Sequence, residues 1–420
     1  MRGAVTPHLA DAARRAARRY GTPLLLTDLP RLHADAAAVR SAFPDPWLRL
    51  YALKANGLPA LVRALPPHGF GATAVSRGEL SLAARAGFAP GDTALEGIGK
   101  TPADLRAAAA AARHGQPLLW TSLESAEEAA ALARLASAAG VRLDVLVRVN
   151  PSVQPETHGG LAVGAATSKF GVLADELPEV IAAGGGPSGP LRWRGLHLHV
   201  GSQLGAVDAW RTAFRATLRL LTLQRGGLPD FDTLDAGSGF PVDYGHGGSV
   251  PSLARFAAEA DAELAALPAG VRPARLAIEP GRAVMAASGW LIGRVLHVRD
   301  REPRLVVLDA GMTELVRPAM YGAEHPMIAL TSVGRPVADA GAPDAALVRV
   351  DGPVCESTDR LGLAVLPPLV RGDLVAIGVA GAYGTAMAST YNGRPRPAEI
   401  GWDGDALVVL RRRGGLAALP

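Results

Sequence analysis

Short apolar runs alternate with longer segments rich in alanine and leucine between about residues 48 and 280. Eight strands are predicted from the short runs, at residues 48–53, 69–75, 93–98, 117–122, 143–149, 195–200, 231–236 and 275–279. Helices are predicted between them, for example at residues 77–87, 101–115, 124–140 and 210–224. Strands that alternate with helices form parallel βα units, and eight such units favour a closed (β/α)8 barrel. An open doubly wound sheet is the alternative.

The pattern changes after about residue 288, where short β-type runs are separated by turns containing Gly or Pro, with no long helices between them. This pattern predicts a separate antiparallel β domain or sandwich. The early apolar run at residues 23–29 is a candidate strand of that domain, because it precedes the first barrel helix. We therefore predict a barrel domain at residues 30–288 and a β domain formed by residues 1–29 and 289–420.

Polar residues gather where the predicted barrel strands end. In a barrel of this kind, the chemistry lies at the C-terminal ends of the strands. The residues found there are Lys54, Ser76, Lys100, Arg148, Asn150, His199, Gly237 to Gly239, and Glu279. Core packing alone is a poor explanation for this placement, so the pattern predicts an active site at the mouth of the barrel.

Composition narrows the class of protein. The 420 residues carry a formal net charge of +4, and the basic residues are scattered, which gives little support for nucleic-acid binding. No run of about 18 uncharged apolar residues occurs, so no membrane-spanning helix is expected. The single cysteine, Cys355, cannot form an internal disulfide and fits a reducing compartment, the cytoplasm. Residues 1–20 are expected to form a short amphipathic helix, with an Arg-rich transit peptide as the alternative.

Lysine is rare in this chain, which has three lysines and 40 arginines. Arginine stays protonated at any usable pH, whereas a lysine amine can lose its proton and attack a carbonyl. Lys54 ends the YALK strand, while Lys100 and Lys169 lie elsewhere. Its position alone is equally compatible with a Schiff-base amine and with an anchor for an anion.

Two motifs after the last two strands add candidate binding groups. LDAGSGFP contains Gly237, Ser238 and Gly239, whose backbone N–H groups can converge on a phosphate; a plain turn is the alternative. IEPGR supplies Glu279, which could keep a pyridine nitrogen protonated, and Arg282, which could bind phosphate or carboxylate. A surface ion pair is the alternative for these two residues.

Other candidates carry weaker signals. HVGSQ offers His199 for stacking on a flat ring and Ser202 for a phosphate oxygen, although a lone barrel histidine is commonly only hydrogen-bonded in the core. Two later motifs, CESTD and GAYGTAMASTYN, supply Cys355, Glu356, Asp359, Tyr383 and Tyr391. A thiol beside carboxylates and tyrosines could donate a proton and recognise an ammonium group, but a buried structural cysteine is the commoner case.

Taken together, the motifs resemble those of the fold-type III pyridoxal-phosphate decarboxylases, most closely the diaminopimelate decarboxylase branch. They span nearly the whole chain in the family's order: YALKAN, AVSRGEL, GIGKT, RVNPSVQPETH, SKFGV, HLHVGSQ, GSGFP, EPGR, RPAMYGAEH, GPVCESTD and GAYGTAMASTYN. The resemblance implies a carboxy-lyase of lysine biosynthesis that depends on pyridoxal 5'-phosphate. It also implies the two-domain architecture of alanine racemase, a (β/α)8 barrel with a C-terminal antiparallel β domain.

The resemblance implies roles for individual residues. Lys54 would hold the cofactor as a Schiff base, His199 would stack on the pyridine face, and Glu279 would meet the ring nitrogen. The residues around the phosphate or the substrate would be Ser202, Gly237, Ser238, Gly239, Arg282 and Tyr383.

The family's active sites lie between the two subunits of a head-to-tail homodimer. The resemblance therefore implies that Cys355, as the proton donor, and Glu356 reach the cofactor of the partner chain. Arg317 and Tyr321 match the positions that hold a distal carboxylate in the diaminopimelate branch. The substrate is thus expected to be an amino acid with an acidic distal end; no metal, nucleic acid or membrane is expected.

The chain departs from the family pattern at three places and leaves alternatives open. Thr73 replaces the usual Asp, Ser238 replaces the middle glycine of GGG, and VGAATSKFG lacks the customary Thr before its glycine. These changes keep the catalytic groups but leave the exact substrate open, including carrier-bound or other precursors of specialised metabolites. A racemase is disfavoured by Glu279, and a catalytically dead regulatory homologue is disfavoured by Lys54 and Cys355.

Overall fold

The computed structural model describes residues 6–153, 157–159, 164, 168–245, 250–337 and 344–418. It forms two compact units. The barrel unit comprises Ala36–Pro241 and Val250–Ala283, and the sheet unit comprises Met1–Asp35, Val242–Ser249 and Val284–Pro420. Parts of the RVNPSVQPETH and VGAATSKFG motifs lie outside the described residues.

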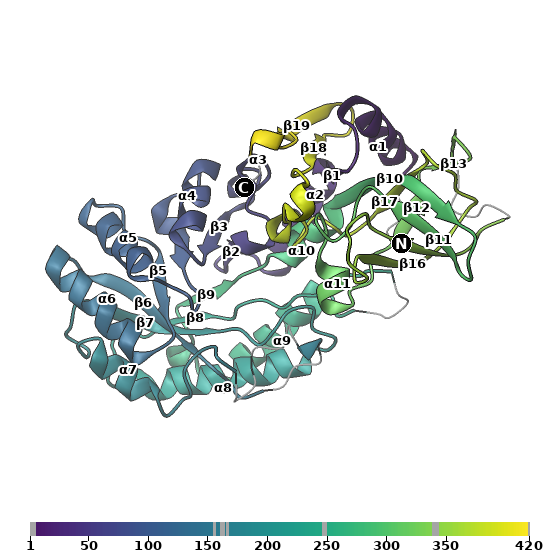
Figure 1. The fold of residues 1–420 in the computed structure, drawn as a ribbon. Helices are drawn as coiled ribbons and strands as arrows, with labels where there is room; N and C mark the ends of the chain where they lie inside the picture. The colour runs from purple at the N-terminus through teal and green to yellow at the C-terminus, as the bar shows by residue number, and fades with distance from the viewer. Residues whose placement is uncertain are drawn as a thin grey trace. The chain divides into compact units, whose positions relative to one another are not determined.

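Eight parallel strands close into a barrel in chain order, as the sequence predicts (Figure 1). They are β2 (Leu48–Ala52), β3 (Phe70–Ala74), β4 (Thr93–Leu95), β5 (Trp120–Leu123), β6 (Leu143–Val149), β7 (Leu191–Leu198), β8 (Thr233–Asp235) and β9 (Arg275–Ile278). β9 pairs back onto β2 through Ala277 and Ile278, which closes the ring. The open-sheet alternative is therefore excluded.

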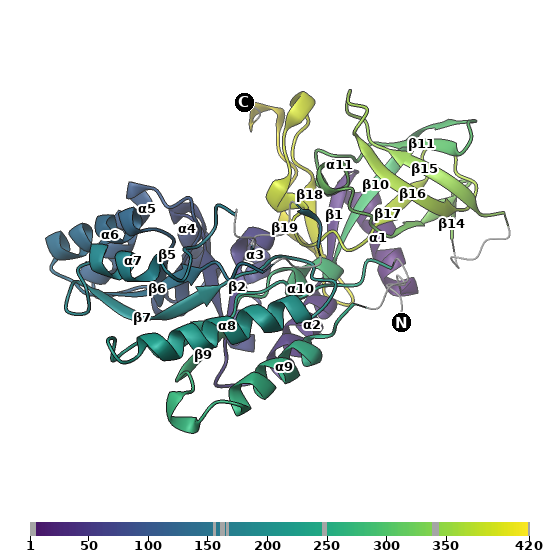
Figure 2. The same ribbon diagram turned by 90° about the horizontal axis from the view of Figure 1, so that it is seen from below.

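Helices surround the barrel strands (Figure 2). They are α2 (Leu29–Ala42), α3 (Pro59–Val62), α4 (Arg77–Ala86), α5 (Pro102–Arg113), α6 (Ala126–Ala139), α7 (Leu177–Ala183), α8 (Asp208–Gln224) and α9 (Leu253–Ala265). The side chains of Ser76 and Ser125 cap α4 and α6 by accepting a backbone N–H three residues later. Both helices end at a glycine in the left-handed conformation, Gly87 and Gly140. Local sequence therefore fixes where these helices start and stop.

The barrel interior changes from apolar to polar along the strands. Its apolar layer is formed by Leu50, Ala94, Trp120, Leu146 and Ala277. Side chains two residues apart on a strand face the same side. The next interior positions toward the C-terminal ends are therefore Ala52, Glu96, Ser122, Arg148 and Glu279. The barrel thus places a polar layer directly on its apolar core.

The sheet unit contains a nine-stranded sheet. Its strands are β1 (Leu24–Asp28), β10 (Gly289–Arg299), β11 (Arg304–Leu308), β12 (Met327–Ala329), β15 (Ala346–Asp351), β16 (Arg360–Leu366), β17 (Leu374–Ile377), β18 (Ala398–Trp402) and β19 (Leu407–Arg411). Short strands β13 (Thr331–Ser332) and β14 (Arg335–Pro336) pair separately. Most pairs are antiparallel as predicted, but β1 pairs with β18 and β11 pairs with β15 in parallel. The sheet is therefore mixed, because long connections allow these distant strands to run in one direction.

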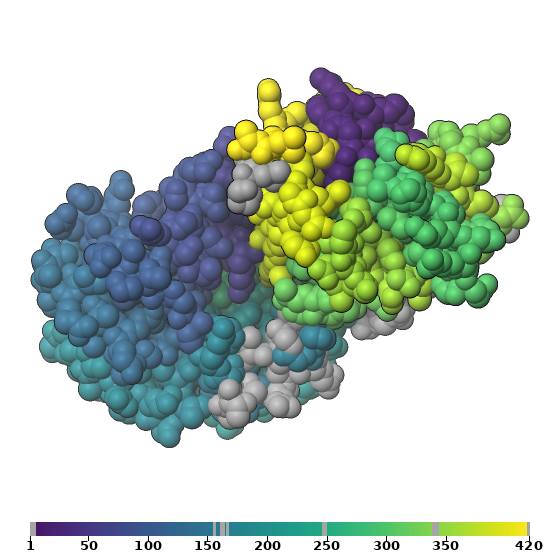
Figure 3. Space-filling view, viewed as in Figure 1, coloured from purple at the N-terminus to yellow at the C-terminus, as the bar shows by residue number. Residues whose placement is uncertain are grey.

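Segments from the first and last parts of the described chain meet in the sheet unit. β1 lies between β10 and β18, and Arg413 donates to the carbonyl oxygens of Tyr20 and Pro23 at 3.2 and 2.8 Å. Helix α1 (Pro7–Tyr20) packs its alanines on one face of this sheet. The purple N-terminal segment and the yellow C-terminal segment accordingly adjoin in Figure 3. Within the described residues, every helix is too short or too polar to span a membrane.

Candidate active site

Lys54 lies in a single 3-10 turn, Leu53–Ala55, that follows β2 directly. Its neighbours Leu53 and Ala55 are buried, whereas Lys54 itself is exposed. The positive charge of Lys54 lowers the pKa of both His199 and Glu279, so the amine belongs to the same electrostatic environment as these two residues. The structure thus brings together the lysine, the histidine and the carboxylate that the sequence singles out.

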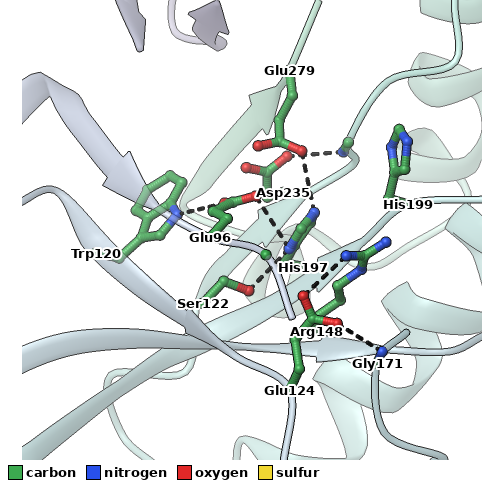
Figure 4. Close-up of polar contacts among 12 residues, drawn as sticks. Glu96, Trp120, Ser122, Glu124, Arg148, Gly171, His197, His199, Asp235 and Glu279 are labelled. Carbon is green, nitrogen blue, oxygen red and sulfur yellow. Dashed lines mark hydrogen bonds and ion pairs between the residues drawn. The ribbon is translucent and has the colours of Figure 1, made fainter. Parts of the chain in front are cut away.

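A cluster of buried polar side chains lies behind Glu279 (Figure 4). Nε2 of His197 is 3.2 Å from Oε2 of Glu279, and Nδ1 of His197 is 3.5 Å from Oε2 of Glu96. Oγ of Ser122 is 2.9 Å from the same Nδ1, and Nε1 of Trp120 donates to Oε1 of Glu96 at 3.2 Å. Glu96 follows β4, Trp120 and Ser122 lie on β5, His197 lies on β7 and Glu279 follows β9, so closure of the barrel assembles the cluster.

Burial and charge set the protonation of this cluster. Burial raises the pKa of Glu96 well above its ordinary value, and the nearby Glu279 carboxylate raises it further. Burial alone would also raise the pKa of Glu279, but His197, Glu96 and Lys54 together hold it well below the usual range. Asp235 has a strongly raised pKa, from burial and then from the charge of Glu279. These shifts favour the anionic form of Glu279 and the protonated forms of Glu96 and Asp235.

The other histidine of the HLH motif is held uncharged. Burial lowers the pKa of His199 well below its ordinary value, and the charges of Lys54 and Arg148 lower it further. Nδ1 of His199 accepts the backbone N–H of Ser238 at 3.2 Å. A neutral ring whose orientation is fixed in this way can stack on a flat ligand without adding charge.

A buried ion pair flanks the polar layer. Nη1 of Arg148 is 3.0 Å from Oε1 of Glu124, with side chains 8% and 2% exposed. The second oxygen of Glu124 accepts the backbone N–H of Gly171 at 3.0 Å, and the Arg148 guanidinium lies 4.8 Å from the centre of the Phe170 ring. The pair joins β5 and β6 to the segment that follows them.

The glycine-rich turn after β8 has no room for larger residues. Gly237 has φ of +61°, and a Cβ there would lie 2.2 Å from the carbonyl oxygen of Leu198. Gly239 has φ of +117°, and a Cβ would lie 2.7 Å from the Leu204 side chain. Nη2 of Arg282 donates to Oγ of Ser202 at 2.9 Å. The backbone N–H groups of Gly237 and Ser238 donate to Oδ1 of Asp235 and Nδ1 of His199, at 2.8 and 3.2 Å. The turn is therefore held in a compact form in the same unit as the Arg282 guanidinium, a group suited to an anion.

Two polar residues at the strand ends have structural contacts instead. The Lys100 side chain is fully buried, forms an ion pair with Glu128 at 3.0 Å and donates to the carbonyl of Gly97. Ser76 caps α4. Their position after a strand therefore reflects helix and loop anchoring.

Arg317 is buried in the sheet unit, at the start of α11 (Arg317–Tyr321). Its Nη1 donates to Oη of Tyr244 at 2.8 Å and lies 3.0 Å from Nε2 of His325. Nδ1 of His325 is 2.9 Å from the carbonyl oxygen of Gly378. Tyr321 is the last residue of the same short helix.

Cys355 and Glu356 lie together in an exposed loop of the sheet unit. Oη of Tyr391 donates to Oε1 of Glu356 at 2.7 Å. Asp359, buried below, accepts the backbone N–H groups of Met312 and Val354 at 2.6 and 2.7 Å. Tyr383 adopts a left-handed backbone with φ of 60°. Asp359 therefore anchors the loop that presents the thiol, which contrasts with the alternative of a buried structural cysteine.

Four interior residues are not among the site residues predicted from the sequence: Glu96, Glu124, His197 and Asp235. A usable signal exists, because each lies two residues from another interior position on its strand. Glu96 follows Ala94, and Asp235 precedes Gly237; His197 precedes His199 in the same way.

Comparisons with known proteins agree with this fold. Residues 29–286 match the family described as pyridoxal-dependent decarboxylase, pyridoxal binding domain. A diaminopimelate decarboxylase of Deinococcus radiodurans is 38% identical over 95% of this chain and 94% of that protein, and one of Aquifex aeolicus is 34% identical over 94% and 90%. A crystal structure of Helicobacter pylori diaminopimelate decarboxylase with L-lysine has a TM-score of 0.86 at 30% identity, covering 96% of this chain and 97% of that chain.

Proposed function

Because this chain belongs to the pyridoxal-dependent decarboxylases and uses pyridoxal phosphate to release carbon dioxide from an amino acid, we propose that its substrate is meso-diaminopimelate, with lysine as the product. The predictions of family, cofactor and enzyme class are confirmed by these comparisons. The observation that carries the substrate is the identity of 38% to a diaminopimelate decarboxylase over 95% of the chain. It supports a role in lysine biosynthesis.

The barrel unit fits the cofactor. Lys54 supplies an exposed amine, and Gly237 and Gly239 form a turn that a larger residue would fill. Oε1 of Glu279 is buried without a hydrogen-bond partner among the described residues, which suits a protonated ring nitrogen. The cofactor, when bound, accepts the electrons left behind by the departing carboxylate.

Different residues of the chain would bind, orient and protonate the cofactor ring. Lys54 would bind the cofactor covalently, and neutral His199 would stack on its pyridine face. Glu279 would keep the ring nitrogen protonated. The phosphate would be held by Ser202, Gly237, Ser238, Gly239 and Arg282.

The sheet unit would supply substrate recognition. Arg317 and Tyr321 would hold the distal carboxylate, and a buried guanidinium suits a bidentate carboxylate contact. Cys355 would return a proton to the carbon that loses its carboxylate, with Glu356 and Tyr383 beside the substrate amine. These roles belong to a head-to-tail homodimer in which residues 1–29 and 289–420 of one subunit complete the barrel site, residues 30–288, of the other.

Two measurements test the proposal. Purified enzyme is expected to release carbon dioxide from meso-diaminopimelate in preference to ornithine, lysine or arginine. Borohydride reduction followed by peptide mapping is expected to place the pyridoxyl label on Lys54. Release from a different carboxylated amino acid alone would reassign the substrate to a specialised pathway, and a label elsewhere would refute the site.

The proposed assembly has tests of its own. Light scattering is expected to give twice the chain mass, and a mixture of Lys54→Ala and Cys355→Ala subunits is expected to regain part of the activity that each variant lacks. The single cysteine fits a reducing compartment, the cytoplasm. A monomer with full activity would refute the shared site.

A further inference from the structure

His197 is buried between the carboxyl groups of Glu96 and Glu279. The proposed reaction gives a role to Glu279 but none to His197 or Glu96. His197, Glu96 and Glu279 are 2%, 3% and 6% exposed, and their ligand-type atoms lie within 4.8 Å of one another. Neither His197 nor Glu96 is among the residues assigned to the substrate or the cofactor above. Burial of polar groups such as His197 and Glu96 beside Glu279 costs free energy. We therefore expect these two residues to act on Glu279.

The neighbours of His197 determine which of its two ring nitrogens carries the hydrogen. Nε2 faces a carboxylate at 3.2 Å, which can only accept, so Nε2 carries the hydrogen. Nδ1 faces the hydroxyl of Ser122 at 2.9 Å, which can donate. Burial lowers the pKa of His197, so the ring is neutral. A neutral ring with hydrogen on Nε2 therefore serves both partners.

A carboxylate that faces a ring nitrogen shares a proton with it. In a dry site this proton can pass to the carboxylate, because two neutral groups cost less to bury than two charges. Donors aimed at the carboxylate oppose that transfer, since they favour its charged form. Whatever donates to Glu279 from behind therefore decides where the shared proton resides.

We propose that His197, backed by the buried Glu96, is a positioning residue that keeps Glu279 anionic and thereby keeps the proton on the ring nitrogen of pyridoxal phosphate. This inference rests on the proposed placement of Glu279 at that nitrogen. It extends that proposal by naming the groups that set the charge of Glu279. Neither residue needs to touch the cofactor.

The charges around the cluster are compatible with a single anion. The groups that face it from the neighbouring elements are Lys54 after β2, Glu124 after β5, Arg148 on β6, His199 after β7, and Asp235 on β8. Arg148 and Glu124 balance each other in an ion pair. Burial and the charge of Glu279 raise the pKa of Asp235, which leaves it protonated.

Glu96 supports His197 because it is uncharged. The indole of Trp120 donates to one of its oxygens, and the other faces Nδ1 at 3.5 Å. An ionised Glu96 would draw a second proton onto the ring and give a cation between two carboxylates. A protonated Glu96 leaves Nδ1 as an acceptor, and its own hydrogen bond to Glu279 adds to the effect of His197 in lowering the pKa of that carboxylate.

The test uses holoenzyme loaded with pyridoxal phosphate carrying ¹⁵N in the ring, whose nitrogen chemical shift reports protonation directly. His197→Leu removes the donor to Glu279 and is expected to lose the protonated-nitrogen signal near neutral pH. His197→Gln places an amide N–H near the position of Nε2 and is expected to restore it. Glu96→Gln is expected to keep the signal, because the amide is uncharged and can still donate a hydrogen bond to Glu279.

Two further variants separate the possible outcomes. Leu146→Ala opens a cavity in the apolar layer and is expected to lower stability while the nitrogen signal stays protonated. Glu279→Gln is expected to lose the signal. If Glu279→Gln loses it but His197→Leu retains it, this inference is overturned and the proposed site stands.

Other results would also decide the question. If Glu279→Gln retains the protonated signal, the placement of Glu279 fails, and the inference fails with it. Loss of the signal in Glu96→Gln would show that an ionisable Glu96 is required and would overturn its neutral role. A stoichiometric divalent metal in the holoenzyme would assign the three side chains to a cation and overturn the inference as well.

Discussion

Two buried histidines, one in each unit, present the same ring nitrogen to groups of opposite charge. In the barrel unit, Nε2 of His197 faces the carboxylate of Glu279 at 3.2 Å, where a hydrogen on that nitrogen would stabilise the anion. In the sheet unit, Nε2 of His325 faces the guanidinium of Arg317 at 3.0 Å and acts as an acceptor. Both rings are only 2 to 3% exposed.

The difference comes from the group on the other ring nitrogen. Nδ1 of His325 lies 2.9 Å from the carbonyl oxygen of Gly378, which fixes the hydrogen on Nδ1 and frees Nε2 to accept. Nδ1 of His197 lies beside the Ser122 hydroxyl, which can donate and so leaves the hydrogen on Nε2. A neutral imidazole can therefore stabilise an anion in one unit and a cation in the other without adding charge.

The largest effect should follow from removing the ion pair that balances charge behind His197. Arg148→Met leaves the buried Glu124 carboxylate without its cation, and the free energy of unfolding should fall by about 3–5 kcal/mol. Denaturant unfolding of the cofactor-free protein measures this. The double variant Arg148→Met/Glu124→Gln should recover much of the loss. A decrease of under about 1 kcal/mol would match an exposed ion pair instead.

The cation of the sheet unit should matter for the substrate more than for folding. Arg317→Leu should lower kcat/KM for meso-diaminopimelate by about 10- to 150-fold, the value of a charged hydrogen bond of about 1.5–3 kcal/mol. Steady-state kinetics measures the ratio. Arg317→Lys keeps the charge but loses the bidentate guanidinium, so its kcat/KM should lie between those of the unchanged enzyme and Arg317→Leu. An equal loss with substrates that lack a distal carboxylate would contradict the assigned role.

The protonated acid of the barrel unit should make stability depend on pH. The folded-state pKa of Glu96 is raised, so its stabilising effect is complete below the ordinary value of 4.5 and is lost as pH rises toward the raised pKa. In that window the free energy of unfolding should fall by about 1.4 kcal/mol per pH unit for this group. Glu96→Gln should flatten the curve of the cofactor-free protein. An unchanged slope would show that Glu96 ionises equally in both states.

The smallest effect should come from the hydroxyl that sets the His197 tautomer. Ser122→Ala removes the 2.9 Å contact to Nδ1 and should lower the free energy of unfolding by about 1 kcal/mol. The protonated-nitrogen signal should also decrease, although less than in His197→Leu. Ser125→Ala, which removes the cap of α6 at a similar cost in stability, is the matched control. If the protonated-nitrogen signal decreases as much in Ser125→Ala as in Ser122→Ala, the hydroxyl of Ser122 does not set the His197 tautomer.

Most of the barrel could be predicted because its strands are short, apolar and separated by helices with clear caps. All eight predicted runs overlap an observed strand, and residues 143–149 match β6 at both ends. β4 ends at Leu95, three residues before the predicted end. Glu96 lies within the predicted run but is the first residue of the loop that follows the observed strand.

The contacts across the barrel were harder to predict. Alternation along one strand tells which side chains share a face, but it does not tell how far apart two strands place them. The meeting of Glu96 from β4, His197 from β7 and Glu279 from β9 depends on the tilt and stagger with which the barrel closes. The parallel pairing of β1 with β18 likewise joins segments from opposite ends of the sequence, for which no local signal exists.

The position of β1 also has a consequence for biosynthesis. Its neighbours β10 and β18 are made long after it, so β1 leaves the ribosome early and waits unpaired while the barrel residues follow. A polypeptide truncated before Ala398 would leave one edge of the apolar strand β1 exposed, and an exposed strand edge is a template for aggregation. Completion of the polypeptide is thus what closes the sheet, and prematurely terminated chains are expected to be cleared or to precipitate.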